Sequence, residues 1–141
     1  MSAPAIDLTA LRKALAQLGE ALSFWQAQAP DSALKPHLRS AVIQSFEYSY
    51  ELSVRMLRRV LIERSEAAGL IADLSFNDLL RKAADAGLIG NPALWRNWRE
   101  MRNATNHAYD EAKAVAVASG AAGFSADAAA LLAALEKSLA N

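Results

Sequence analysis

The chain contains no cysteine, which excludes a disulfide framework and any metal site built from thiolates. Glycine and proline are scarce, with six and four residues among 141, and β-branched residues are few beside the many alanines and leucines. This composition favours an all-α fold. A chain of this length can bury a real hydrophobic core, so we expect residues 1–141 to form a single helical domain.

Excess charge and long apolar runs are also lacking. Fifteen basic residues balance fifteen acidic ones, so the chain has no general positive field of the kind that duplex-DNA-binding proteins use. We expect no apolar run long enough to cross a bilayer and see no signal sequence, which predicts a cytoplasmic protein without a membrane partner. Ten of the basic residues are arginines, which suit contacts with phosphates or carboxylates.

Apolar residues at helical spacing predict five helices, four long and one short, packed as an antiparallel bundle. Their expected ranges are residues 7–28, 36–68, 76–85, 92–120 and 126–139. Gly69 and Gly87 are expected to end the second and third helices, and the segment 120–123, with glycines at both ends, to separate the last two. The leucines of the first helix would also suit a coiled-coil seam with another chain, although such leucines more often form a bundle core.

Polar side chains are concentrated on the helix predicted for residues 92–120. Asn91 and Pro92 are a favourable N-cap and first residue, and an apolar stripe follows from Leu94 to Val115 at helical spacing. The helical wheel places opposite or beside that stripe Arg99, Arg102, Asn103, Asn106, His107, Tyr109 and Asp110. A solvated helix face would explain them. However, two turns of poor helix formers give up helix propensity, which favours a functional reason.

The order of these residues resembles a known signature. Arg102, Asn103, His107 and Tyr109 form Arg-Asn-x(3)-His-x-Tyr, which is similar to the Arg-x(4–6)-His motif of HEPN domains. The segment 98–111 resembles the nucleotidyltransferase substrate-binding protein family, which includes HepT-like toxins paired with small MNT-type nucleotidyltransferases. The segment 44–52, Gln-Ser-Phe-Glu-Tyr-Ser-Tyr-Glu-Leu, is similar to another run of the same family. Both motifs occur in the expected order, so the resemblance is specific.

Two interpretations fit the acidic residues of the second motif. On the predicted 36–68 helix, charged residues recur at every fourth position, namely Glu47, Glu51, Arg55, Arg59 and Glu63. This spacing is typical of a ladder of i,i+4 ion pairs on a solvated face. The family resemblance implies instead that Glu47 and Glu51 belong to a functional site or a partner surface. At Val54-Arg55 the chain keeps the basic residue of the family pattern but not the aromatic one before it.

The motif suits RNA cleavage without a metal. A base takes the proton of a ribose 2′-OH, that oxygen attacks the phosphate, and cations stabilise the developing charge. His107 titrates near neutrality, and Arg102 can hold two phosphate oxygens. Positioning roles remain for the other polar residues of the face, which are Arg99, Asn103, Asn106 and Asp110. One histidine is fewer than an acid–base pair needs, so a two-fold homodimer would supply the second. HEPN ribonucleases are similar, since the family implies a homodimer with a composite cleft.

A metal site is the competing enzymatic interpretation. His107, Asp110 and Glu111 are close in sequence, but the neighbouring Arg99 and Arg102 would repel a cation. We therefore expect no metal and no other cofactor.

Tyr109 has two interpretations of its own. A tyrosine at the edge of a bundle usually packs with its hydroxyl at the rim. The family resemblance implies that the partner nucleotidyltransferase attaches AMP to this residue. Such AMPylation would place a bulky anion beside Arg102 and His107 and block phosphate entry.

The family resemblance implies the toxin component of a two-gene toxin–antitoxin module, paired with an MNT-type nucleotidyltransferase and acting as a metal-independent endoribonuclease. The alternative is a non-enzymatic subunit that presents a substrate to a nucleotidyltransferase or docks with it. The chain lacks an acidic triad after a Gly-Ser turn, so it is not the transferase itself.

Overall fold

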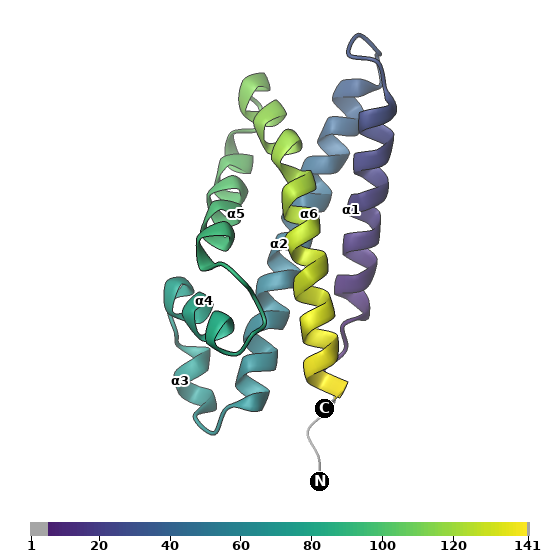
Figure 1. The fold of residues 1–141 in the computed structure, drawn as a ribbon. Coiled ribbons are helices and arrows are strands. Elements are labelled where there is room, and N and C mark those ends of the chain that lie inside the picture. The colour runs from purple at the N-terminus through teal and green to yellow at the C-terminus, as the bar shows by residue number, and fades with distance from the viewer. Residues whose placement is uncertain (1–5, 141) are drawn as a thin grey trace.

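The computed structural model describes residues 6–140, which form helices and no strand (Figure 1). The helices are α1 (Thr9–Ala27), α2 (Lys35–Arg64), α3 (Ala68–Ala72), α4 (Phe76–Asp85), α5 (Pro92–Ala104) and α6 (Glu111–Ala140), with the 3₁₀ turn η1 (Thr105–His107) before α6. The long helices α1, α2, α5 and α6 run alternately up and down (Figure 1). The predicted all-α helical bundle is therefore confirmed.

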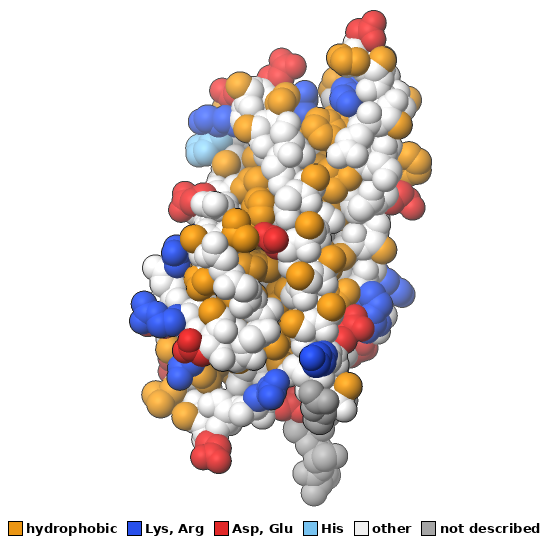
Figure 2. Space-filling view, viewed as in Figure 1, with side chains coloured by type: hydrophobic (Ala, Val, Ile, Leu, Met, Phe, Trp, Pro, Cys, Tyr) orange, Lys and Arg blue, Asp and Glu red, His pale blue; other side chains and the backbone are white. Residues whose placement is uncertain are grey.

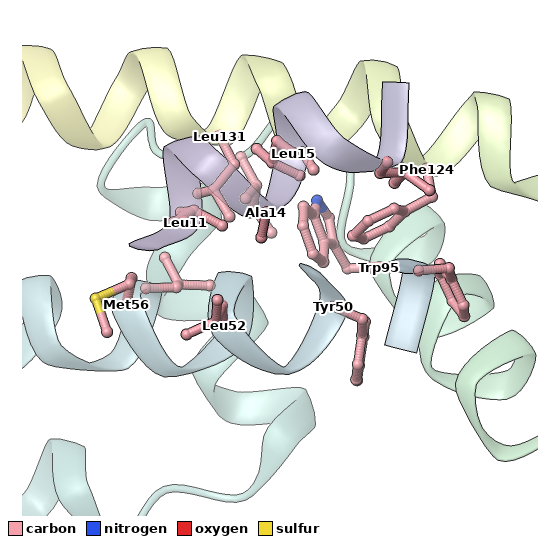
Figure 3. Packing of buried hydrophobic residues seen from close by; sticks show 14 of the residues in the cluster. Leu11, Ala14, Leu15, Tyr50, Leu52, Met56, Trp95, Phe124 and Leu131 are labelled. Atoms are coloured by element: carbon pink, nitrogen blue, oxygen red, sulfur yellow. The ribbon is translucent and has the colours of Figure 1, made fainter. Parts of the chain in front are cut away.

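Phe124 of α6 is the centre of the core around which the helices meet. Its side chain is fully buried, and the rings of Phe46, Trp95 and Trp98 meet it edge-on at centroid distances of 5.0, 5.9 and 5.9 Å. Edge-to-face pairs of this kind add to the free energy of burying the rings. Figure 3 shows Trp95 and Phe124 together between the helices. These contacts hold α5, whose C-terminal end carries the motif, against α2 and α6.

The predicted capping residues occupy their expected places. The Asn91 side chain accepts a hydrogen bond from the Ala93 backbone N–H at 2.9 Å, at the start of α5. The Ser75 hydroxyl accepts one from the Asp78 N–H at 3.2 Å, at the start of α4. Gly87, with φ of +76°, follows α4 in the left-handed region that favours glycine. These two helix starts are confirmed. They could be predicted because side-chain caps act over two or three residues.

The predicted break at residues 120–123 is wrong, because α6 continues through it. A glycine in a helix costs only about 1 kcal/mol relative to alanine. Here both glycines lie where α5 approaches α6. A Cβ at Gly120 would lie 2.7 Å from Sδ of Met101, and one at Gly123 would lie 3.1 Å from Cη2 of Trp98. The glycines therefore allow close helix packing, which outweighs their low helix propensity.

The uninterrupted course of α6 also changes the expectation about apolar runs. Because α6 has 30 residues and contains an 18-residue window of mean hydropathy 1.5, its length and composition alone would allow it to cross a membrane. The expectation that no such run exists was wrong for that reason. In the structure α6 is a bundle helix that buries Phe124, Leu131 and Leu135. A helix in the core of a bundle can have this length and composition without crossing a membrane.

The end of α2 and the buried face of α5 also differ from the prediction. Helix α2 ends at Arg64, and Gly69 lies inside the short helix α3 instead of ending α2. On α5 the buried residue is Trp95, which is 3% exposed, whereas Leu94 is 39% exposed. Because successive residues are turned by about 100° around a helix, the buried face is shifted toward Trp95, while Trp98, Met101 and Ala108 of the predicted stripe still pack partly buried against the core. It is set by the aromatic contacts with Phe124.

Candidate functional site

The sequence predicted that the motif would lie on one straight helix. In the structure it lies instead at the corner between α5 and α6. Helix α5 ends at Ala104, and the chain turns through η1 before α6 begins at Glu111 (Figure 1). The Thr105 hydroxyl donates to the Arg102 carbonyl at 2.7 Å, while the Asp110 carboxylate accepts from the Lys113 N–H at 3.1 Å. Such local bonds compete with a continuous helix. The poor helix formers noted in the sequence therefore form a turn.

Arg102 is the most firmly held of the predicted site residues. Its Nε and Nη2 donate to Oε1 of Glu51 on α2, at 3.2 and 2.8 Å, and its Nη1 donates to the Thr105 hydroxyl at 2.9 Å. Its side chain is 25% exposed. The pairing joins the two sequence motifs, which come from different helices. Arginine has further N–H groups on Nη1 and Nη2, and these remain available for an anion.

His107 and Tyr109 form a second, more exposed pair. His107 Nδ1 and the Tyr109 hydroxyl lie 3.4 Å apart, and the two rings meet edge-on with centroids 6.0 Å apart. Tyr109 is 86% exposed, so its hydroxyl is accessible from solvent. The expectation that Tyr109 would pack at the rim of the bundle does not describe this position. The pair leaves Nε2 of His107 for chemistry.

The remaining predicted residues have separate surroundings. Asn103 and Asn106 are exposed, and neither side chain makes a hydrogen bond within residues 6–140. Asp110 caps α6, as described above. Arg99 lies over the ring of Phe76, with its Cζ 4.9 Å from the ring centroid, and so packs toward α4. The structure therefore keeps Arg102 and the His107 pair near the corner and assigns Arg99 and Asp110 structural contacts.

The predicted ladder on α2 does not form. None of its i,i+4 pairs brings nitrogen and oxygen within 4.0 Å in the described part of the chain, and Glu51 binds Arg102 instead. Glu47, one turn before Glu51, is half-buried. Exposed i,i+4 pairs contribute only a few tenths of a kcal/mol, so a stronger contact across helices displaces them. This outcome favours the interpretation that Glu51 belongs to the site.

Two residues near the corner were missed by the sequence reasoning. Thr105 falls within the predicted apolar stripe between Leu94 and Val115, yet its hydroxyl bonds Arg102. Arg39, near the start of α2, has a side chain only 18% exposed and lies 3.9 Å from the Glu111 carboxylate at the start of α6. No local spacing connects Arg39 with residues more than 60 positions later. The hydrogen bond from the Thr105 hydroxyl to the Arg102 carbonyl could have been predicted, because Thr105 follows Arg102 by three residues and that spacing allows such a bond.

Burial and nearby charges shift the pKa of Tyr50, which precedes Glu51 on α2. Tyr50 is 8% exposed, and its burial raises the pKa to about 12, while the nearby Arg99 and Arg102 lower it and Glu51 raises it further. The phenol therefore stays neutral and able to donate a hydrogen bond.

On the face seen in Figure 2, basic and acidic side chains are interspersed, so no single-sign patch covers that face.

Comparison with known proteins identifies the family. The family described as nucleotidyltransferase substrate binding protein like matches residues 6–137. The chain belongs to this family. The chain is 42% identical to the probable ribonuclease HepT of Haemophilus influenzae over 86 residues. Those 86 residues make up 61% of this chain and 59% of that protein. The match thus spans less than two thirds of that relative's length.

A solved structure supports the same membership. HI0074 from Haemophilus influenzae, described as having the fold of a substrate-binding domain of a nucleotidyltransferase, matches with a TM-score of 0.83 and 33% identity. The match covers 92% of this chain and 99% of that one. The family resemblance inferred from the two motifs is confirmed.

Proposed function

We propose that this protein is a metal-independent endoribonuclease, the toxin component of a toxin–antitoxin pair with an MNT-type nucleotidyltransferase. The observation that carries the proposal is the Arg102 guanidinium, oriented by Glu51 and Thr105 at the corner that also presents the exposed His107. Membership in the nucleotidyltransferase substrate-binding family and similarity to a probable ribonuclease HepT support it.

In this mechanism His107 acts at the ribose 2′-OH. In the tautomer that carries its proton on Nδ1, facing the Tyr109 hydroxyl 3.4 Å away, Nε2 is free to take the 2′-OH proton. The 2′ oxygen attacks the adjacent phosphorus, and the bond to the 5′ oxygen of the next nucleotide breaks. The free N–H groups of Arg102 stabilise the charge on the phosphate oxygens. The products are a 2′,3′-cyclic phosphate and a 5′-hydroxyl.

The leaving 5′ oxygen needs a proton, which a second histidine would supply. We propose a two-fold homodimer in which His107 of the other copy acts as this acid. Static light scattering is expected to give the mass of a dimer at micromolar concentration. A strict monomer would contradict the composite site.

The cleavage proposal is tested with purified protein and RNA. His107→Ala and Arg102→Ala should each lower the cleavage rate by about 10²–10⁴-fold, with EDTA having no effect on the wild-type protein. His37→Ala is the matched control, because His37 is the other histidine of the chain, is exposed on α2 and is not part of the motif. Intact RNA with wild-type protein, or a His107→Ala variant that cleaves at the wild-type rate, would refute the ribonuclease.

We further propose that the nucleotidyltransferase partner attaches AMP to Tyr109. The 86% exposure of this side chain makes its hydroxyl accessible, and the product would place a phosphodiester beside His107. Co-expression with the transferase followed by mass spectrometry should find the adduct in wild type and in Tyr48→Phe, but not in Tyr109→Phe. Tyr48 is a suitable control because it is 54% exposed. An adduct elsewhere would contradict this switch.

A non-enzymatic substrate-binding subunit is the second candidate. The observation that favours it is the engagement of Arg102 by a carboxylate, which lowers the positive charge offered to a phosphate. The description of HI0074 as a substrate-binding domain supports it too. Under this candidate the protein binds the transferase but leaves RNA intact, so the cleavage assay separates the two.

A further inference from the structure

A groove with an apolar floor and an arginine rim lies on α2 directly beside the Arg102–Glu51 pair. Its volume is about 450 Å³. Its apolar lining consists of Val54 and Ile62, which are half-buried, and Tyr50, which is buried; this lining is called the floor. Glu51 closes the end near Arg102, so the groove and the proposed phosphate contact share a residue. The rim consists of Arg55, Arg58 and Arg59.

The three rim arginines have different roles. Arg58 Nη1 donates to the carbonyl oxygens of Ile71 and Leu74, at 3.1 and 3.0 Å, and so ties α3 and the following turn to α2. Arg55 and Arg59 are exposed and have no carboxylate within 4.0 Å among residues 6–140. They lie four positions apart on one helix face, where like charges repel. Two such charges beside an apolar floor favour an anionic ligand.

We propose that this groove binds one nucleotide of single-stranded RNA, next to the phosphate that Arg102 contacts. The base would lie on the floor of Val54 and Ile62, and the backbone phosphates would contact Arg55 and Arg59. A bare phosphate would leave the floor exposed to water, and an uncharged apolar ligand would leave both arginines without a partner. The volume is within the range of small-ligand sites. The inference rests on the proposed ribonuclease function and extends it to substrate binding.

Helix geometry supports a continuous path for the strand. Residues four positions apart are separated by about 6 Å along a helix axis, so Glu51, Arg55 and Arg59 mark regular steps away from Arg102. Arginine combines a charge with a planar face, which suits both phosphates and bases. Groove binding of a single strand commonly pairs basic side chains with a surface for the bases.

The test measures binding without cleavage. Fluorescein-labelled poly(U) RNA is titrated with the His107→Ala protein, with and without Arg55→Gln and Arg59→Gln, and fluorescence anisotropy is recorded at several salt concentrations. The double change should weaken binding by about tenfold or more and lower the salt dependence by about one to two phosphate contacts. The matched control is Lys13→Gln with Lys82→Gln, which removes the same charge from exposed helix positions outside the groove. It should change the affinity by less than about twofold.

A second arm tests the floor. Val54→Thr keeps the side-chain shape but replaces a methyl group by a hydroxyl, so it should weaken poly(U) binding several-fold while leaving the affinity for inorganic tripolyphosphate unchanged. Equal losses for both probes would overturn base binding. Equal losses in the arginine and lysine variants would overturn the groove as the site.

Two further outcomes separate the groove from rival explanations. If Arg55→Gln with Arg59→Gln converts a dimer into a monomer in light scattering, the groove is an interface between copies and the proposal fails. If wild-type protein cleaves RNA but the arginine variant binds poly(U) as tightly as its parent, the groove fails while the proposed function stands. If wild-type protein does not cleave RNA, the proposed function fails, whereas a groove-specific loss of poly(U) binding still supports the groove.

Discussion

Replacing Glu51 by Gln tests whether the neighbouring helix orients Arg102 for function. Gln has almost the same shape and keeps an oxygen that can accept hydrogen bonds from Nε and Nη2 of Arg102, but it carries no charge. The bond from Nη1 to Thr105 is unaffected. We expect the guanidinium to stay near α2 but to occupy a wider range of positions.

The structure sets the size of the effect. Opposite charges about 4 Å apart near a protein surface attract by about 4 kcal/mol before desolvation and entropy are counted. The side chains are 25% and 50% exposed, and water screens such pairs to about 0.2–1 kcal/mol. Because one carboxylate oxygen accepts two bonds from Arg102, we expect the upper half of that range for the loss in free energy of unfolding. A misplacement of about 1 Å in a phosphate contact can cost about 100-fold in rate, so cleavage should fall by about 10–100-fold.

Two measurements check this. Urea unfolding of Glu51→Gln, Arg102→Gln and the double variant gives the coupling energy between the two side chains. Single-turnover RNA cleavage gives the rate, with Glu63→Gln as a control because Glu63 is exposed on the same helix and has no carboxylate–cation contact within residues 6–140. A Glu51→Gln protein that cleaves as fast as wild type, or faster, would show that the carboxylate competes with the phosphate, and the positioning argument would be wrong.

Three other predictions concern the scaffold. Gly19→Ala should stabilise the protein by up to about 1 kcal/mol, since nothing lies within 4 Å of its new Cβ, whereas Gly123→Ala should lose that gain against the Trp98 ring; chemical unfolding compares them. Because burial raises the pKa of Tyr50 from 10.0 to about 12, its neutral form stabilises the fold below pH 10, and this contribution is lost as the pH rises toward 12. Tyr50→Phe should remove that pH dependence, as urea unfolding across the range would record. Asp110→Ala should cost about 1 kcal/mol by removing the cap of α6, measured by thermal unfolding, and an unchanged melting temperature would contradict the capping role.

The sequence by itself determined the features that depend on short-range contacts. The caps at Ser75 and Asn91 act within two or three residues, so the starts of α4 and α5 could be predicted. The leucine spacing of α1 follows from helical periodicity, and its leucines are buried. The order and spacing of two motifs also sufficed for the family.

Only the tertiary structure decided how those motifs meet and where the helices continue. Glu51 and Arg102 are 51 positions apart, and no helical periodicity links them, so the i,i+4 ladder was the natural but incorrect local prediction. Likewise, the glycines at 120 and 123 have a low helix propensity whose penalty is local and small, about 1 kcal/mol each. Their fit against Met101 and Trp98 comes from the packing of α5 on α6, and it keeps α6 continuous. Contacts between helices outweigh such local preferences because they bury large apolar surfaces, which a sequence pattern on one helix does not reveal.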